Sequence, residues 1–365
     1  MKNRKKLFLD ILPPPDYLRM PVLCLDLSDK SVKYMELKRK NGVISVNQFG
    51  IFSLESGTIE GGEIKQKDKL ISFLKQIKEK LKTELVACSL PEEKVFLSRI
   101  KFPLMSEDKI KEALSLQIEE YIPLSNAEAI FDYDVINDFA KDKEQSHLHL
   151  NLAAFPKSFV ESYRDVFIGA GFIPVAFEME VQAFARAVVP EKEMDNVMVI
   201  DFGRTRTTFA IVSGGKVQFA TTIALAGEEI EKAFILNLKI DRSQVEAAKR
   251  DIGLIKRKGN ESLFESLSPL VSVIKDEAAK QAAYWASQNE DDKKNDKISK
   301  IILCGGESTL AGLPEFLSYE LKMRVELGNP WVNAVSFEDY IPEIEMRDSL
   351  AYSTAIGLAL RQWIN

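Results

Sequence analysis

Cysteine and histidine are scarce in this sequence, which has three cysteines and two histidines in 365 residues. Cys24, Cys88 and Cys304 lie far apart and form no CxxC pair, so the sequence excludes a zinc ribbon and a disulfide framework and suits a reducing compartment. His147 and His149 alternate along one predicted strand and therefore face the same side. Because no third ligand lies near them, we interpret this pair as a polar strand face and not as a metal site.

Long apolar runs and a basic surplus are also missing. No apolar run reaches the roughly 18 residues that a membrane-spanning helix needs. Residues 1–20 are basic and then apolar, with a Pro13-Pro14-Pro15 break and no signal-peptide cleavage pattern, which predicts a flexible extension. Contact of its lysines with anionic lipid is the open alternative. The net charge of -6 excludes nucleic acid as the main partner.

Two segments about 175 residues apart share one design. Residues 22–37 and 197–212 each contain an apolar run, an aspartate (Asp26 or Asp201), a polar turn and then alternating apolar residues. This pattern predicts two β-hairpins, each of which delivers an aspartate to the end of its first strand. A third segment, 301–314, reads as a buried strand, a Gly-Gly turn and the start of a helix. Together they predict a nucleotide clamp between two domains.

The chemistry of a nucleoside triphosphate suggests roles for these residues. Mg²⁺ is held through one or two carboxylates, often by way of water, which points to Asp26 and Asp201. Hydroxyls and backbone N–H groups in polar turns bind phosphate oxygens, and the candidates are Ser28, Ser31, Gly203, Thr205 and Thr207. Lys33 is either a phosphate contact or a solvated strand lysine. Gly305 and Gly306 lack a Cβ, so the backbone there can approach an adenosine closely.

The rest of the pattern predicts an α/β chain of two related domains. A strand–helix–strand–strand unit interrupts the first domain and predicts a small inserted subdomain. The expected boundaries are a flexible extension at 1–20, domain I at 21–188 with the insertion at about 88–155, domain II at 189–348 with a helical subdomain at about 227–290, and a C-terminal helix at 349–365 that packs back on domain I.

The order of these motifs resembles the actin-like ATPase superfamily, in its FtsA-like branch and most closely the PilM family of type IV pilus assembly proteins. The resemblance spans about 22–363. It includes Leu90-Pro91, 99–103, 116–123, 226–230, Gly305-Gly306, 327–330 and 351–359. It implies an actin-like ATPase fold, with two related domains around a nucleotide cleft and an FtsA/PilM-type inserted subdomain. It also implies ATP and Mg²⁺ as ligands.

The resemblance adds Gly227, Glu246 and Lys249 to the candidate nucleotide site. Glu246 and Lys249 match a stretch that commonly meets ribose and adenine in the superfamily, although an ordinary exposed i,i+3 pair has the same spacing. One turn departs from the family pattern, because Ser28-Asp29 replaces its usual glycine and Ser/Thr. A serine fits there only if its φ stays negative or if the strain is carried elsewhere. We therefore expect nucleotide binding with weak or absent hydrolysis. No water-positioning residue is assigned; Glu119 and Glu120 are candidates.

The resemblance implies an ATP-binding assembly protein of the type IV pilus machinery. Such a protein binds the N-terminal cytoplasmic tail of a PilN-like inner-membrane partner, contacts other pilus platform proteins and stays in the cytoplasm, associated with the membrane through partners. We expect the peptide groove between domain I and the inserted subdomain, with walls from 91–102 and 152–159. Self-association is left open.

Three alternatives remain. An FtsA-like filament protein would carry a C-terminal membrane helix, whereas this sequence ends directly after its last predicted helix. A type II secretion platform component normally continues into a transmembrane helix. A sugar kinase would need a substrate pocket with a catalytic aspartate, and no such pattern is present.

Overall fold

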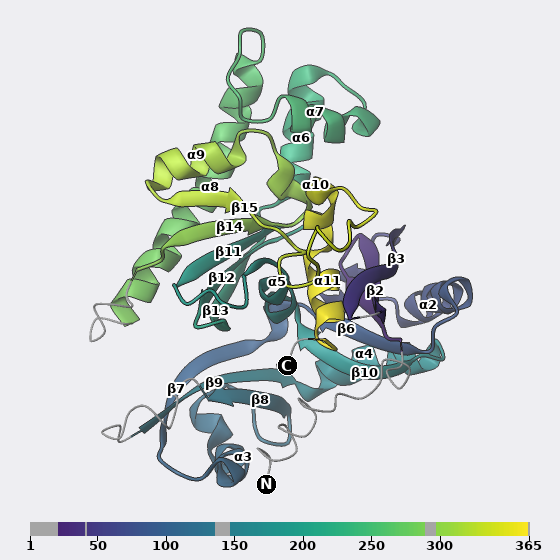
Figure 1. Cartoon of the computed structure of the whole chain (residues 1–365), viewed down its shortest axis with the longest axis vertical. Helices are drawn as coiled ribbons and strands as arrows, with labels where there is room; N and C mark the ends of the chain where they lie inside the picture. The colour runs from purple at the N-terminus through teal and green to yellow at the C-terminus, as the bar shows by residue number, and fades with distance from the viewer. Residues whose placement is uncertain (1–20, 41, 136–146, 289–296, 364–365) are drawn as a thin grey trace.

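The computed structural model of the chain describes residues 21–40, 42–135, 147–288 and 297–363. The predicted extension at 1–20 lies outside the described residues. Two five-stranded sheets and one three-stranded sheet form the framework (Figure 1). The described part of the chain contains no helix that is both long and apolar enough to cross a membrane.

The two large sheets have the same topology. The first has the order β10-β6-β1-β2-β3 and the second has the order β15-β14-β11-β12-β13. The first sheet consists of β1 (Leu23–Leu27), β2 (Ser31–Lys40), β3 (Val43–Ser53), β6 (Leu85–Leu90) and β10 (Ile173–Met179). The second consists of β11 (Val197–Phe202), β12 (Thr207–Ser213), β13 (Lys216–Ile223), β14 (Lys300–Cys304) and β15 (Arg324–Leu327). The two predicted hairpins are therefore part of a larger repeat, which extends to the strand order of both sheets.

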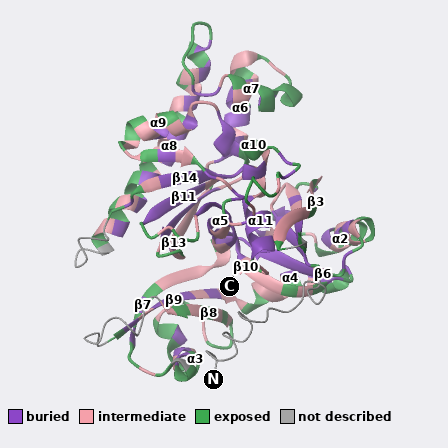
Figure 2. Ribbon diagram, viewed as in Figure 1, coloured by how far each residue is buried: buried purple, intermediate pink, exposed green. Residues whose placement is uncertain are grey.

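Each sheet is buried on both faces, and this explains the near-continuous apolar runs in its central strands. Along β1, Leu23 and Leu25 pack on the outer helices while Cys24, between them, packs toward the other sheet. Figure 2 shows β11 and β14 as almost wholly buried. The outer helices of the first sheet are α2 (Lys67–Leu81) and α4 (Lys157–Gly169); those of the second are α6 (Gly227–Leu238), α8 (Glu261–Gln288) and α9 (Leu313–Leu321).

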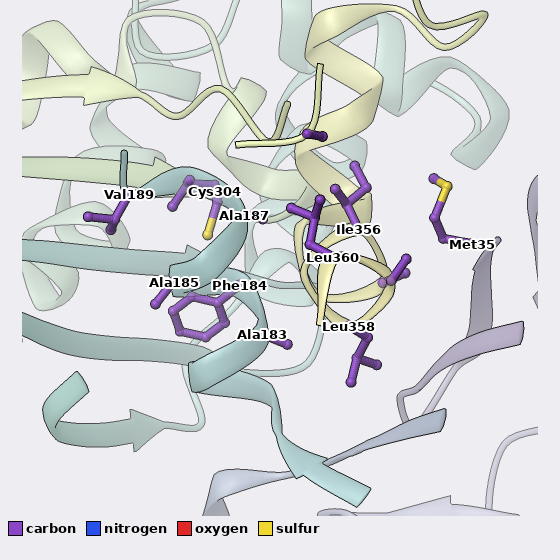
Figure 3. Close-up of a cluster of buried hydrophobic side chains, with 14 of the residues drawn as sticks. Met35, Ala183, Phe184, Ala185, Ala187, Val189, Cys304, Ile356, Leu358 and Leu360 are labelled. Atoms are coloured by element: carbon purple, nitrogen blue, oxygen red, sulfur yellow. The ribbon is translucent and has the colours of Figure 1, made fainter. Parts of the chain in front are cut away.

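Two short helices, α5 (Glu180–Val188) and α11 (Ser353–Leu360), lie between the two large sheets (Figure 1). Their buried side chains form one cluster with residues from both sheets, including Met35 and Cys304 (Figure 3). The helices approach very closely, because a Cβ at Gly357 would lie 1.7 Å from the carbonyl oxygen of Ala183. Only glycine fits at this crossing. The single cluster joins the two sheets into one core.

The third sheet has the order β7-β9-β8 and lies below the first in the view of Figure 1. Its strands are β7 (Phe96–Pro103), β8 (Ala129–Val135) and β9 (His147–Pro156), and α3 (Glu107–Gln117) covers one face with its own small core. The predicted strand–helix–strand–strand order is confirmed. A short 3₁₀ helix, η2 (Glu92–Lys94), connects β6 to β7, whereas β9 continues directly into α4.

Some local predictions were wrong. The segment 349–363 does not form one helix, because α10 (Met346–Ser349), a 3₁₀ turn at 350–352 and α11 divide it. Strand β13 and its pairing with β12 were not predicted. The turn at Gly214-Gly215, where both glycines have positive φ, is the signal that predicts such a hairpin.

We expect Gly357→Ala to destabilise the protein strongly, because the added methyl group overlaps a backbone atom of α5 that cannot move independently. The predicted loss in the free energy of unfolding is about 3 kcal/mol, at the upper end for an overpacked core. Urea unfolding followed by circular dichroism measures it. Gly306→Ala is the matched control, because its Cβ would come no closer than 3.6 Å to Ala351. Equal stability of the two variants would contradict the close crossing.

Candidate functional site

The turns that follow β1 and β11 have the same geometry. Ser28 N–H donates to Ser31 O at 2.9 Å, and Gly203 N–H donates to Arg206 O at 3.0 Å. Asp26 and Asp201 occupy the same place in the two hairpins, opposite Lys33 and Thr208 respectively. The structure thus brings the two predicted aspartates to equivalent positions at the ends of equivalent strands.

The unusual Ser28-Asp29 sequence is accommodated without backbone strain. Ser28 is not among the described residues with positive φ, so a serine satisfies this turn. Its hydroxyl also lies 3.0 Å from Ser31 O and 3.1 Å from Ser31 Oγ. The Asp29 carboxylate accepts hydrogen bonds from Gly61 N–H at 3.1 Å and Gly62 N–H at 3.2 Å, in the β4–β5 hairpin (Ile59–Glu60 and Glu63–Ile64). Asp29 therefore turns away from the place where a phosphate is predicted.

A cavity of about 310 Å³ lies between the two turns. Most of the predicted site residues line it: Asp26, Ser28, Ser31, Lys33, Asp201, Gly203, Thr205, Glu246, Gly305 and Gly306. Three predicted residues do not. Thr207 is fully buried and its hydroxyl donates to Leu225 O at 2.6 Å. Gly227 and Lys249 lie outside the cavity, and both contact Glu307, which lines it.

Gly227 and Lys249 both position Glu307, which lines the cavity. A Cβ at Gly227 would lie 2.2 Å from the Glu307 carboxyl group. Lys249 is 3% exposed and its Nζ lies 2.7 Å from Glu307 and 3.0 Å from Glu246. Burial raises the pKa of Glu307, and the nearby Lys249 opposes this shift. The pair Glu246 and Lys249 is thus no ordinary exposed pair, because its lysine is a buried counter-ion.

Gly305 is required by packing within the protein, independently of the predicted approach of its backbone to an adenosine. Its φ is +87°, and a Cβ there would lie 2.3 Å from Asp201 Oδ1 and 2.4 Å from Phe202 O. Close packing against β11 therefore requires Gly305. At Gly306 a Cβ would meet only Ala351, so this position leaves room beside the cavity.

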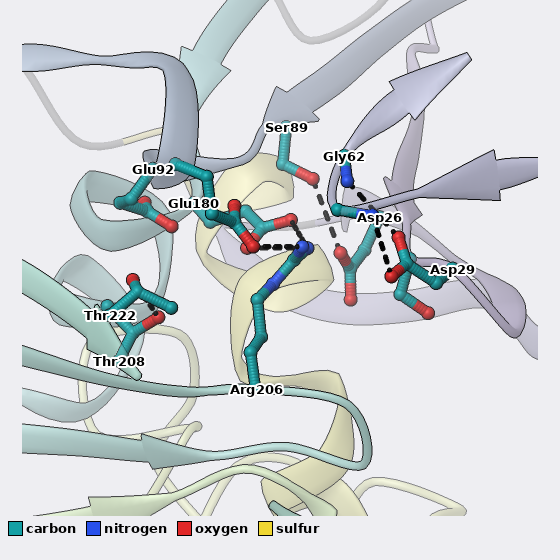
Figure 4. Close-up of polar contacts among 12 residues, drawn as sticks. Asp26, Asp29, Gly62, Ser89, Glu92, Glu180, Arg206, Thr208 and Thr222 are labelled. Atoms are coloured by element: carbon teal, nitrogen blue, oxygen red, sulfur yellow. Dashed lines mark hydrogen bonds and ion pairs between the residues drawn. The ribbon is translucent and has the colours of Figure 1, made fainter. Parts of the chain in front are cut away.

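Lys33 is the cation between the two aspartates. Its Nζ lies 3.3 Å from Asp26 Oδ2, and Ser89 Oγ donates to Asp26 Oδ1 at 3.3 Å (Figure 4). Burial lowers the pKa of Lys33, but the charges of Asp26 and Asp201 outweigh this and raise it overall. Burial raises the pKa of Asp201 to about 6, and Lys33 lowers it in part. Lys33 is therefore a half-buried charge that lines the cavity beside Asp26, and not a fully solvated strand lysine.

Sequence reasoning missed several polar residues that line the cavity: Lys30, Ser53, Glu180, Arg204, Arg206, Glu307, Ser353 and Thr354. Lys30, Arg204 and Arg206 lie inside the two polar turns, so their position was the available signal. Glu180 begins α5 directly after an apolar strand, as the two aspartates end theirs. Glu119 and Glu120, proposed earlier as water-positioning candidates, are exposed beyond α3 and do not line this cavity.

Arg206 joins the second turn to the first half of the molecule. Its guanidinium lies 3.0 Å from Glu180 and 2.8 Å from Glu93, and Figure 4 shows it extended toward Glu180. Glu92 accepts a hydrogen bond from Val181 N–H, while within the described residues its Oε2 has no hydrogen-bond partner. Burial raises the pKa of Glu92 to about 8, with Arg206 opposing it, and burial likewise raises the pKa of Glu180.

The residues present fit a magnesium ion that arrives with a nucleotide. Across the described ranges, no three His, Cys, Asp or Glu side chains are grouped to hold a metal. Mg²⁺ bound together with a nucleotide needs only one or two carboxylates, because water and phosphate oxygens complete its coordination. Asp26 and Asp201 supply that number at the cavity wall.

A second cavity, of about 360 Å³, lies between the first and third sheets. Strands β8 and β10 border it, and each pairs on one side only among the described strands. Its apolar wall includes Leu97, Ala153 and Phe155, from both predicted wall segments, together with Ile130, Phe131, Val160 and Phe177. Asp132 and Asp134 give it an acidic margin, Lys111 also lines it, and Glu178 is paired with Arg186. We call this cavity the groove.

Two sheets of identical strand order, facing each other across a polar cavity with an aspartate from each, define an actin-like ATPase fold. Residues 24–363 match the family model of the type IV pilus assembly protein PilM, so the chain belongs to the PilM family.

Solved structures agree with this fold. A PilM–PilN type IV pilus biogenesis complex is 22% identical, with 94% of this chain and 98% of that chain covered and a TM-score of 0.75. MreB5 of Spiroplasma citri bound to AMPPNP is 14% identical, with 94% and 97% covered and a TM-score of 0.53. The same protein bound to ADP is 14% identical, with 95% and 99% covered and a TM-score of 0.52.

We expect the stability of the protein to fall as the pH rises from about 4.5 to about 8. Glu92 has a raised pKa in the folded state, so over this range the unfolded chain releases a proton that the folded protein retains. Glu92→Gln should reduce this fall, and the raised pKa values of Glu180, Asp201 and Glu307 account for the remainder. Urea unfolding at a series of pH values measures it, with the exposed Glu119→Gln as control. An unchanged slope in Glu92→Gln would contradict the assignment.

Proposed function

We propose that this chain is a cytoplasmic assembly module of the type IV pilus that binds the N-terminal tail of a PilN-like inner-membrane protein in the groove. The observation that carries this proposal is the groove itself, a channel with an apolar wall and polar margins between β8 and β10, each of which pairs on one side only among the described strands. An extended peptide can pair its backbone with a free strand edge and place alternate side chains in pockets. Membership of the PilM family and the likeness to a PilM–PilN complex support it.

The acidic margin of the groove favours a peptide that carries positive charge. Asp132 and Asp134 are exposed at this margin, and Lys216 neutralises Asp134 only in part, at 3.8 Å and with both side chains solvated. A peptide with apolar and basic residues in alternation matches the apolar floor and this rim. The chain would then be held at the membrane through its partner, alongside other platform proteins.

The second part of the proposal is that the cavity between the two turns binds ATP with Mg²⁺. The two aspartates, Lys33 and the hydroxyls of the turns are suited to a metal-bound polyphosphate. The side of the cavity near Gly306 and Glu246 would take the adenosine. MreB5, which shares the fold, has been solved with AMPPNP and with ADP. Hydrolysis is proposed to be slow, because Arg206 already engages Glu180, the carboxylate best placed to orient water.

We expect Asp201→Asn to weaken ATP binding at least tenfold in excess Mg²⁺, because the variant loses a carboxylate that holds the metal. In EDTA, where no Mg²⁺ is bound, the wild type and Asp201→Asn should bind ATP with the same affinity. The neutral asparagine does not weaken the binding of the metal-free phosphates. Calorimetric titration of the nucleotide-stripped protein measures both. Asp195→Asn, an exposed aspartate just before β11, is the matched control. Equal ATP affinity of Asp201→Asn and the wild type in Mg²⁺ would contradict the metal role.

We expect Ile130→Asp to weaken binding of a synthetic peptide, the N-terminal cytoplasmic segment of the PilN-like protein, by about tenfold or more. Ile130 is 42% exposed and lines the groove, so the substitution changes the groove without opening the core. Fluorescence anisotropy measures the affinity. Leu116→Asp, on α3 of the same subdomain and 81% exposed, is the control. A similar effect of both substitutions would place the peptide elsewhere.

A further inference from the structure

The short connection η2 is held from both turns that border the nucleotide cavity. From the second turn, Arg206 reaches Glu93 of η2 at 2.8 Å while it also pairs with Glu180. From the first turn, Asp29 holds Gly61 and Gly62 in the β4–β5 hairpin. Pro91, directly before η2, packs so closely on Gly62 that a Cβ there would lie 2.3 Å from its ring. The conformation of η2 therefore depends on both turns.

The same connection leads into the wall of the groove. Three residues after η2 ends, Leu97 of β7 lines the groove. On the other side of η2 and β7, a separate cavity of about 550 Å³ borders Glu93 and Val95. Glu93 and Val95 therefore face open space, whereas Leu97 packs on the central core and β7 is paired with β9 along its length. A change in the Arg206–Glu93 contact can thus reach the groove through one short segment.

Arg206 lies where a nucleotide phosphate would compete with the carboxylates of Glu180 and Glu93 for its guanidinium. Its side chain is 11% exposed and lines the nucleotide cavity, yet both of its ion pairs are made to groups of the first half of the chain. A guanidinium binds a phosphate with the same planar fork that it offers a carboxylate. Arg204, in the same turn and cavity, instead pairs with Glu231 of α6 at 3.2 Å, and within the described residues it makes no ion pair with the first half of the chain.

We propose that Arg206 couples the two sites: the terminal phosphate of ATP draws its guanidinium away from Glu93, η2 and β7 loosen, and the groove loses affinity for its peptide. The inference rests on the proposed function, since it needs both ligands. ATP and peptide then oppose each other, and the opposition is reciprocal. ADP, which lacks the terminal phosphate, leaves the Arg206–Glu93 pair in place.

The test measures the affinity of the full chain for the synthetic PilN-like peptide by anisotropy, with no nucleotide, with ADP and with AMPPNP, each in Mg²⁺. For the wild type we expect AMPPNP to raise the peptide Kd about tenfold and ADP to leave it nearly unchanged. Glu93→Ala, at a side chain that is 26% exposed and outside the nucleotide cavity, should show the raised Kd without nucleotide. AMPPNP should raise the peptide Kd of this variant by less than about a further twofold.

Two further variants separate this coupling from a general loss of charge. Arg204→Gln removes the same charge from the same turn, so it should weaken AMPPNP binding yet keep the tenfold effect once nucleotide is saturating. The double variant Arg206→Gln/Glu93→Ala should bind peptide no more weakly than Glu93→Ala, because both changes break one contact.

The outcomes are distinct. A wild-type response to AMPPNP in Glu93→Ala would overturn the inference, as would tighter peptide binding in AMPPNP. If the wild type binds both ligands and neither affects the other, the coupling is wrong and the proposed function stands. If nucleotide or peptide does not bind at all, the proposed function is wrong and the coupling with it.

Discussion

The contact between α5 and α11 is the constraint on which the remaining architecture depends. These two helices fill the space between the large sheets, and their closest approach is set by Gly357 against Ala183. Because the helices cross without an intervening side chain, the two sheets come near enough for the turns after β1 and β11 to border one cavity. A wider crossing would separate Asp26 from Asp201. The geometry of the cavity is thus a consequence of core packing and not of contacts within the cavity.

The cavity is built from a repeat whose two copies carry different charges. Ser31 and Arg206 are equivalent positions of the repeat, as are Lys33 and Thr208, so Lys33 and Arg206 place their charges at different positions of the two hairpins. Each turn also carries a further cation that lines the cavity, Lys30 in the first and Arg204 in the second. The positive charge of Lys33 interacts with Asp26 and Asp201. Arg206 serves carboxylates that belong to the other half of the chain. A shared backbone design therefore supports two separate electrostatic tasks.

Much of this was predictable from sequence, because apolar periodicity and turn residues determine strands directly. The hairpins at Asp26 and Asp201, the Gly305-Gly306 turn and the inserted strand–helix–strand–strand unit have clear local signals. The missed features depend on distant partners. Nothing local indicates that Lys249 is buried against Glu307, that Asp29 binds the β4–β5 hairpin, or that Arg206 reaches Glu93. Long polar side chains look solvated in a sequence, and only the fold shows which are enclosed.

The two connections of the third sheet differ in kind, and this limits how the sheet can move. Strand β9 ends at Pro156 and α4 begins at Lys157, so no loop separates them and that corner is fixed to the body of the protein. The other connection passes through the short η2. The Arg206–Glu93 ion pair holds this second connection, and hydrogen bonds from Asn151 to Val217 O and from Lys216 to Val135 O tie the sheet to β13. If the proposed coupling releases η2, we expect the sheet to pivot about the β9–α4 corner, so that the groove widens first at the η2 end and a bound peptide is released from that end.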